Sequence, residues 1–214
     1  MRFNVKPYVT DVVNSFKNDR SILAWDAVNE PDRDNGNSYG KNYFKLELVN
    51  KGEMGIKLVQ KKNFLLREIN PSQPIKAAPW VGDCTSVEKM NDIYRFLFEN
   101  SYVITFHCYD KADEFEKRIK LLEQFKRPFI CTEYMSRGSG STFETVTPIA
   151  KKYKVGAIGW GLVSGKSQTF YAWDSWQNQY ANEPVVWFHD VFHANGKPNS
   201  DAEIKLLKTL TEKK

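Results

Sequence analysis

The chain has 214 residues, of which 41% are hydrophobic and 14% aromatic, so it can bury a substantial core and lacks the composition of a disordered or collagen-like protein. Its formal charge of +5 arises from 31 basic and 26 acidic residues spread along the whole sequence. Because these charges form no basic stripe, we expect no nucleic-acid partner. No apolar run reaches the roughly 18 residues of a membrane span, so we expect no membrane partner either.

The three cysteines, Cys84, Cys108 and Cys131, are an odd number. Two of them fall inside apolar runs, where a thiol usually acts as a small hydrophobic group. We therefore predict free thiols rather than a disulfide framework. The first six residues lack the apolar segment of a secretory signal, so the sequence predicts no targeting signal in this chain.

Apolar residues at helical spacing alternate with short runs of β-branched and aromatic residues. This alternation is typical of repeated units in which a helix connects two parallel strands. In chain order, the expected pairs of helix and following strand are 7–18 with 22–28, 44–69 with 74–80, 87–97 with 102–109, 115–122 with 129–132, and 143–153 with 155–162. An irregular aromatic stretch at 167–199 and a last helix at 201–212 complete the pattern.

This order of elements predicts the α/β class, with five strands that each follow a helix. No linker rich in proline, glycine or serine divides the chain, so we expect one domain over residues 1–214. The first element is a helix without the strand that would normally precede it, which suggests part of a larger fold. A doubly wound binding fold is disfavoured because no glycine-rich turn follows an early strand.

Two carboxylates stand where predicted strands end. Glu30 follows the run 22–28, and Glu133 follows the run 128–131. In parallel α/β barrels the active site is built at these strand ends, whereas carboxylates elsewhere are mostly solvated. Paired acids are also what glycoside hydrolysis requires, since one donates a proton to the leaving oxygen and the other attacks the anomeric carbon.

The motif Trp25-Asp26-Ala27-Val28-Asn29-Glu30-Pro31 resembles the acid/base motif on the fourth strand of clan A glycoside hydrolases, and of family 5 in particular. In that clan the nucleophile is a glutamate that ends the seventh strand, which matches Ile130-Cys131-Thr132-Glu133-Tyr134. The motif Phe106-His107-Cys108-Tyr109 is similar to the sixth strand, and Gly159-Trp160-Gly161 to the eighth. The resemblance covers about residues 8–210, and four motifs in order on successive strands make it specific.

The resemblance implies a (β/α)8 TIM barrel, represented here by about five βα units that correspond to strands 4 to 8, with the first three strands outside the chain. It implies hydrolysis with retention of configuration, in which Glu30 is the acid/base and Glu133 the nucleophile. Asn29 is expected to contact the sugar 2-hydroxyl, and His107 and Tyr109 the nucleophile or the sugar. No cofactor or metal is implied.

The substrate implied by the resemblance is a β-linked polysaccharide or oligosaccharide of the glucan or mannan type. Trp160 is expected to stack on a sugar ring, and Trp80, Trp173 and Trp176 are further candidates for a sugar platform. Trp25 is expected to pack inside or beneath the site, and Trp187 to anchor the segment before the last helix. The loop 31–43 is expected to influence substrate choice, and family relatives suggest a secreted or periplasmic location.

Three other sequence patterns are weaker indications of a functional site. His189 and His193 are four residues apart but lack a third ligand, so we predict no metal site and expect them to pack before the last helix. The stretch 161–167 imitates a phosphate loop with one residue too few. Residues 137–141 are predicted to form a flexible loop before a helix capped by Ser141 or Thr142.

The predicted strands 22–28 and 155–162 would have unpaired apolar edges if the other strands are absent, and such edges favour self-association. Two hypotheses therefore stay open. The chain is either a hydrolase, closed by further sequence or by a second copy, or a catalytically inactive remnant that binds carbohydrate.

Overall fold

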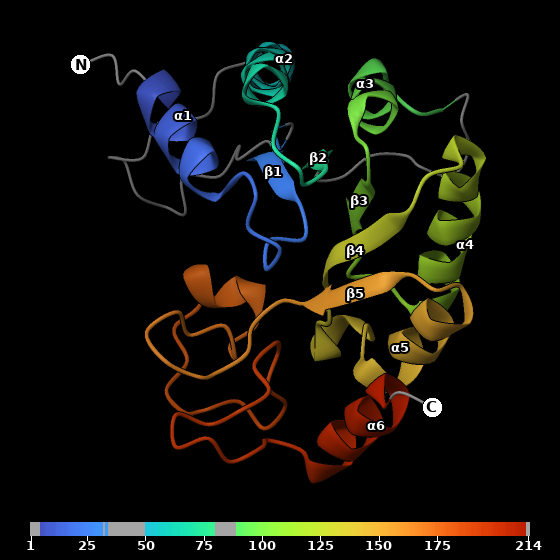
Figure 1. Ribbon diagram of the computed structural model, residues 1–214. Coiled ribbons are helices and arrows are strands. Elements are labelled where there is room, and N and C mark those ends of the chain that lie inside the picture. Colours follow the sequence, from blue (N-terminus) through green and yellow to red (C-terminus); the bar gives the residue numbers. More distant parts are fainter. Residues whose placement is uncertain (1–4, 32, 34–49, 80–88, 213–214) are drawn as a thin grey trace. The chain divides into compact units, whose positions relative to one another are not determined.

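A computed structural model of the protein describes residues 5–31, 33, 50–79 and 89–212 (Figure 1). They form two compact units. The described residues of the first unit are 5–31, 33, 50–79, 89–106 and 122–129, and those of the second are 107–121 and 130–212. The expectation of one domain over residues 1–214 stays a prediction.

Helices and strands alternate along the described chain, as the hydrophobic pattern predicts (Figure 1). The helices are α1 (Val5–Phe16), α2 (Lys51–Ile69), α3 (Asp92–Asn100), α4 (Ala112–Leu122), α5 (Phe143–Lys152) and α6 (Asp201–Thr211). The strands are β1 (Trp25–Asn29), β2 (Ile75–Ala78), β3 (Ile104–His107), β4 (Phe129–Tyr134) and β5 (Gly156–Gly159). Short 3-10 turns lie at Glu123–Phe125, Arg137–Ser139 and Trp173–Trp176.

The strands form two sheets. β1 and β2 make a two-stranded parallel sheet, and the second sheet has the strand order β3-β4-β5, in which β4 and β5 are parallel. Parallel strands between helices confirm the predicted α/β class. Over the described residues the sheets do not close into a barrel, so the (β/α)8 architecture stays a prediction.

The first unit packs its helices on the β1-β2 sheet through small apolar clusters. Val13, Ala27, Leu66 and Ile75 form one of them, with Trp25 at its side. The Trp25 indole also donates a 3.0 Å hydrogen bond to the Gln73 side chain. Trp25 therefore packs inside the fold, as expected from the sequence.

The second unit buries apolar side chains from α4, α5 and β4. Phe115, Ile119, Cys131 and Val146 have no more than a trace of exposed surface. The helix α5 begins at a capping box in which the Thr142 hydroxyl accepts the Thr145 N–H, so Thr142 rather than Ser141 is the cap. This cap fixes where the chain turns back after β4.

The strand boundaries differ from the prediction at several places, two of which concern Glu133 and Trp160. Glu133 lies inside β4 rather than after it, because the strand continues to Tyr134. β5 ends at Gly159, three residues before the predicted end, because Gly161 takes a left-handed φ of +82°, which an extended strand excludes. Trp160 consequently stands just beyond the strand.

The described cysteines are free thiols, as predicted. Cys108 and Cys131 are both buried, and burial raises the pKa of each. Cys84 lies outside the described residues. No helix among those described has both the length and the apolar character needed to cross a bilayer.

Candidate active site

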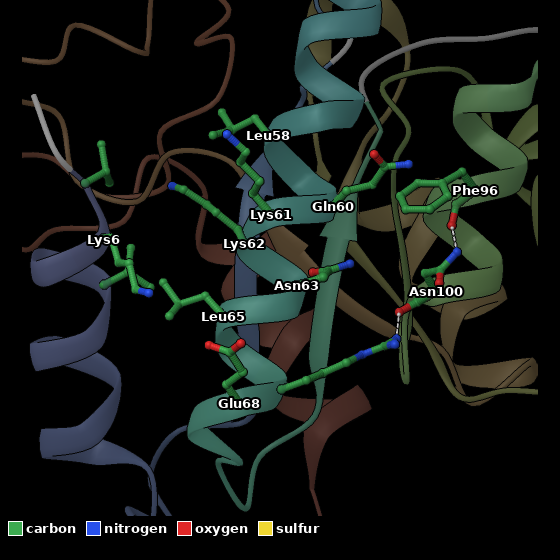
Figure 2. A pocket seen from close by; sticks show the side chains of 13 residues that line it. Lys6, Leu58, Gln60, Lys61, Lys62, Asn63, Leu65, Glu68, Phe96 and Asn100 are labelled. Atoms are coloured by element: carbon green, nitrogen blue, oxygen red, sulfur yellow. Dashed lines mark hydrogen bonds between the residues drawn. The ribbon is translucent and has the colours of Figure 1, made fainter. Parts of the chain in front are cut away.

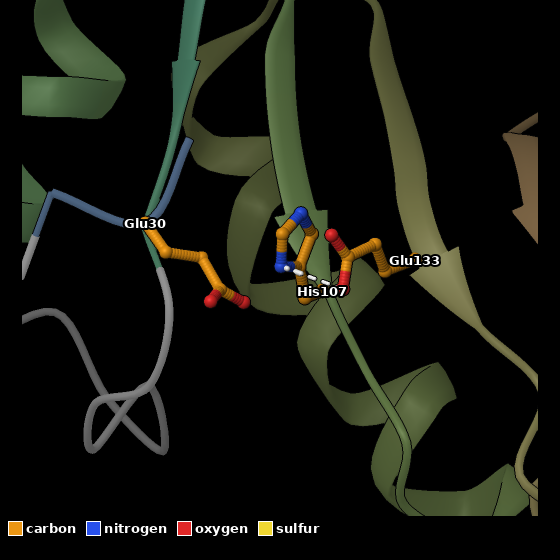
Figure 3. Close-up of side chains that lie close together, drawn as sticks. All are labelled: Glu30, His107 and Glu133. Atoms are coloured by element: carbon orange, nitrogen blue, oxygen red, sulfur yellow. Dashed lines mark ion pairs between the residues drawn. The ribbon is translucent and has the colours of Figure 1, made fainter. Parts of the chain in front are cut away.

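Glu133 is the best-supported candidate for a reactive group in the second unit. Its Oε2 accepts a 2.8 Å hydrogen bond from the Tyr109 hydroxyl and lies 3.5 Å from Nδ1 of His107. Figure 3 shows the His107 ring beside the Glu133 carboxylate. The glutamate side chain is 14% exposed, so it is largely desolvated yet still accessible to a ligand. Charge-assisted hydrogen bonds of this kind fix the orientation of a carboxylate.

The chain that carries His107 and Tyr109 is held in place by backbone bonds. The Cys108 N–H donates a 2.9 Å bond to the Glu133 carbonyl. The Arg118 guanidinium, on α4, donates a 2.7 Å bond to the His107 carbonyl. The two side chains therefore reach Glu133 from a segment with little freedom to shift.

Both strands that bear a candidate carboxylate are irregular near it. The β4/β5 register shifts between Cys131 and Tyr134, and the β1/β2 register shifts between Asp26 and Asn29. Irregular registers of this kind re-aim side chains and recur next to active sites. Each irregular stretch is directly followed by a non-glycine residue with a positive φ, which is Glu30 at 45° in one case and Met135 at 75° in the other. Such backbone strain often accompanies functional sites.

An aromatic cluster lies against Tyr109. The Trp173 ring meets the Tyr109 ring edge-on, with centroids 5.1 Å apart, and the His189 ring lies 5.7 Å from both. Phe188 packs on Trp173 and His189 at 4.8 and 4.7 Å. Trp173 keeps 46% of its surface exposed, which leaves a flat apolar face available to a sugar ring.

His189 is a part of this site that sequence reasoning missed. It was assigned only to packing before the last helix, and it does pack there, but its Nδ1 also lies 2.6 Å from the Met135 carbonyl, two residues after Glu133. Burial lowers the His189 pKa more than this hydrogen bond and Asp190 raise it, so the ring is neutral at pH 7 and Nδ1 carries the proton. Its proximity to Glu133 arises from the fold, and the i, i+4 spacing to His193 gives no hint of it.

Arg137 and Glu203 anchor the segment beneath the aromatic cluster. The Arg137 guanidinium forms a bidentate pair with Glu203 at 2.8 and 2.7 Å and also donates to the Trp187 and Asp190 carbonyls. The Arg137 N–H donates to the Phe188 carbonyl at 3.0 Å. The prediction of a flexible loop at 137–141 is therefore wrong, because a buried charge pair and backbone bonds fix its start.

Trp160 directly follows β5. Its backbone N–H donates a 3.0 Å bond to the Tyr134 carbonyl, and its side chain is 45% exposed. Gly161 comes next, and a Cβ there would lie 2.8 Å from both the Asp190 carboxylate and the His189 Cβ. Only glycine fits this turn, which sets the direction in which the chain leaves Trp160.

The first unit carries the other candidate carboxylate. The Glu30 N–H donates a 2.9 Å bond to the Ala78 carbonyl, so the residue continues the β1/β2 pairing. Its Oε2 lies 3.5 Å from the Arg33 guanidinium. Asn29, the last residue of β1, is exposed. Glu30 and Asn29 thus end a parallel strand, as the sequence predicts.

The remaining candidates are less well described. Trp80 and most of the loop 31–43 lie outside the described residues, and so does the Trp176 side chain. Trp187 is buried and donates a 2.6 Å bond to Glu183, in line with a packing role.

Comparison with protein-family models and with curated proteins found no match. Solved structures do match. An endo-β-1,4-xylanase of glycoside hydrolase family 10 from Gloeophyllum trabeum is 18% identical, with a TM-score of 0.59 and coverage of 97% of this chain and 66% of its own. The hyperthermostable endo-1,4-β-D-mannanase of Thermotoga petrophila is 14% identical, with a TM-score of 0.61 and coverage of 96% and 63%.

A third match is a GH5_18 protein from Streptomyces cattleya, solved in complex with Manβ1-4GlcNAc. It is 10% identical, with a TM-score of 0.59 and coverage of 98% and 54%. At these identities the likeness concerns the fold alone. The chain therefore has an α/β fold similar to that of glycoside hydrolases, and it spans from 36% to 66% of the length of the structures that it matches.

Proposed function

We propose that the protein is a retaining glycoside hydrolase of the clan A kind, closest to family 5, with Glu133 as nucleophile and Glu30 as acid/base. The observation that carries the proposal is the environment of Glu133. A largely buried carboxylate accepts a 2.8 Å bond from Tyr109 beside His107, next to an aromatic cluster that keeps one tryptophan face open. The fold shared with xylanases and mannanases supports the same reaction class.

In the proposed reaction the ionised Glu133 attacks the anomeric carbon and forms a glycosyl ester, while the bond to the leaving oxygen breaks. Glu30 gives its proton to that oxygen. It then removes a proton from water, which attacks the anomeric carbon and releases Glu133 as a carboxylate. The route requires the two carboxyl groups to stand about 5–5.5 Å apart in the working enzyme.

The other proposed contacts follow from the chemistry of each side chain. Tyr109 holds the Glu133 carboxylate in its attacking orientation, and His107 contacts the same carboxylate or the sugar. Asn29 binds the sugar 2-hydroxyl. Trp160 and Trp173 offer exposed rings to the apolar faces of sugar units, and Trp80 is proposed as a further platform.

The proposed substrate is a β-linked glycan of the glucan or mannan type. The proposed complete fold is a (β/α)8 barrel, to which residues 1–214 contribute five strands. In that barrel the outer edges of β1 and β5 would pair with further strands. Self-association of the chain through these edges is the proposed alternative to further sequence.

One observation favours a second function. The chain spans 66% of the xylanase, 63% of the mannanase and 54% of the GH5_18 protein, as expected of a carbohydrate-binding remnant that retains the aromatic cluster without catalysis. The two functions differ in what Glu133 does. A hydrolase depends on the charge and position of this carboxylate, whereas sugar binding on tryptophan faces does not.

The experiment is to measure reducing-sugar release from β-1,4-glucan, mannan and xylan by the protein and by Glu133→Gln and Glu30→Gln variants. Glu144→Gln, at an exposed position on α5, is the matched control. The proposal predicts release by the protein and the control, and its loss in both test variants. Sugar binding by all four folded proteins without any release would overturn the hydrolase and support the remnant.

A further inference from the structure

The first unit contains a cavity of about 990 Å³ on the faces of α1, α2 and α3 (Figure 2). Its size is at the upper end of the roughly 300–1,000 Å³ that ligand sites occupy. It is formed by helices and not by strand ends. Its lining residues are none of those proposed for catalysis, so a function here would be additional to the hydrolase chemistry.

A buried amide gives this cavity a polar point of attachment. Asn63, on α2, lines the cavity and is 7% exposed, and its Oδ1 has no hydrogen-bond partner within the described structure. Leaving a buried acceptor unsatisfied costs free energy, so such groups usually have a partner. A hydroxyl or N–H group of a ligand would satisfy it.

The cavity also has an excess of positive charge. Lys61, Lys62 and Arg67 line it, and Glu68 brings one negative charge to the same lining (Figure 2). The Arg67 guanidinium is held by a 3.2 Å bond to the Asn100 carbonyl and lies over the Tyr102 ring. This arrangement favours an anionic ligand.

Apolar side chains line other parts of the cavity, together with the polar Gln60 and Asn100 and the charged Lys6. Val9 is on α1, and Leu65 and Phe96, which Figure 2 labels, are on α2 and α3. Leu58, also in the lining, is 43% exposed. A ligand with C–H faces would cover such surface and gain from its burial.

We propose that this cavity binds an acidic oligosaccharide, that is, a carbohydrate with uronate carboxylates. This class offers all three features at once. Its carboxylates match the lysines and Arg67, its hydroxyls can donate to Asn63, and its ring C–H faces match the apolar lining. A neutral sugar leaves the positive charge unmatched, and an alkyl carboxylate leaves the Asn63 acceptor unmatched.

The experiment is calorimetric titration of the full chain with trigalacturonate, with cellotriose as the neutral probe and hexanoate as the anion without hydroxyls. The variants are Asn63→Leu and the double variant Lys61→Gln/Lys62→Gln. The matched control is Lys57→Gln, which removes one exposed charge from the same helix outside the lining. Circular dichroism establishes that each variant is folded, and Glu133→Gln removes any turnover.

The expected result is that trigalacturonate binds, and that each test variant weakens binding by about fivefold or more, the effect of one lost hydrogen bond or charge contact. Lys57→Gln and Glu133→Gln should leave the affinity unchanged. Added salt should weaken binding. Trigalacturonate affinity that is the same in the unchanged protein, in folded Asn63→Leu and in the folded double variant, or hexanoate binding as tight as that of trigalacturonate, would overturn the proposal. Cellotriose binding that the double variant weakens equally would do the same, whereas cellotriose bound at the proposed catalytic site should not respond to these variants. The outcome does not depend on hydrolysis, so it leaves the proposed function untouched.

Discussion

The Tyr109 hydroxyl donates a 2.8 Å hydrogen bond to Oε2 of Glu133, across 24 residues of sequence. The Tyr109 ring is in turn held by Trp173 and His189, whose centroids lie 5.1 and 5.7 Å away. The carboxylate is thus positioned by a phenol that is itself packed on two rings. Preorganisation of this kind is what a nucleophile needs before its substrate arrives.

We predict that Tyr109→Phe lowers kcat/KM about 10- to 100-fold, because a hydrogen bond to a charged group contributes about 1.5–3 kcal/mol. The ring remains, so packing on Trp173 should persist. Steady-state kinetics on the best substrate measures the effect. Tyr153→Phe is the control, since Tyr153 donates a similar 2.6 Å bond to Glu116, a residue with no proposed catalytic role. Unchanged kinetics in Tyr109→Phe would contradict a positioning role.

The buried pair of Arg137 and Glu203 should be important for stability. Removal of one partner from a buried ion pair typically costs about 3–5 kcal/mol, because the other charge is left uncompensated. We therefore expect Arg137→Met to lower the free energy of unfolding by about this amount, measured by urea denaturation. The double variant Arg137→Met/Glu203→Leu should have a higher free energy of unfolding than Arg137→Met alone, because it leaves no unpaired buried charge.

An exposed pair provides the contrast. Lys117 lies beside Glu114 on α4, with 65% and 46% of the two side chains exposed. Lys117→Met should change the free energy of unfolding by no more than about 1 kcal/mol, because solvent screens exposed pairs. If Lys117→Met and Arg137→Met lowered the free energy of unfolding by similar amounts, the buried Arg137–Glu203 pair would contribute no more to stability than an exposed pair.

Two glycines with the same backbone conformation test the packing below Trp160. Gly161 has φ of +82° and Gly196 has φ of +81°, but a Cβ at Gly161 meets atoms at 2.8 Å, while a Cβ at Gly196 meets nothing within 4 Å. Gly196→Ala should cost about 1–2 kcal/mol for the left-handed backbone alone. Gly161→Ala should cost about 1–3 kcal/mol more for overpacking against His189 and Asp190. Equal costs in urea denaturation would contradict the close packing.

The His189 pKa, which burial lowers, predicts a pH dependence of stability. The unfolded chain binds a proton near pH 6.5 and the folded protein only at lower pH, so the free energy of unfolding should fall as pH decreases below about 6.5. In His189→Gln this part of the pH dependence should be absent, whereas His193→Gln should retain it. Denaturation series between pH 5 and 8 provide the comparison, and identical slopes for the protein and His189→Gln would refute the assignment.

Local patterns predicted a large part of this fold. Apolar spacing located the helices α1, α4, α5 and α6 within three residues and located the starts of α2 and α3 less closely, and the end of β1 before Glu30 followed from a short apolar run before polar residues. The Thr142 cap was one of two alternatives. These features depend on neighbours in sequence, which is why the sequence contains them.

Contacts between distant residues were not predictable in the same way. The Arg137–Glu203 pair joins residues 66 apart, and His189 reaches Met135 across 54 residues. Nothing local distinguishes Glu203 from Asp201, the other acidic residue of the last helix, as the partner of Arg137. The glycines and serines of 137–141 predict a flexible loop. The register shifts beside Glu30 and Glu133 depend equally on the partner strand.

The central claim is that Glu133 is the nucleophile, and trapping its glycosyl ester tests this claim most directly. The protein would be incubated with a 2-deoxy-2-fluoro β-glycoside carrying a good leaving group, which slows hydrolysis of the ester, and then digested and analysed by mass spectrometry. The account predicts a single glycosyl adduct on the peptide that contains Glu133, and none in Glu133→Gln. An adduct on another residue, or continued hydrolysis of an ordinary substrate by Glu133→Gln, would contradict it.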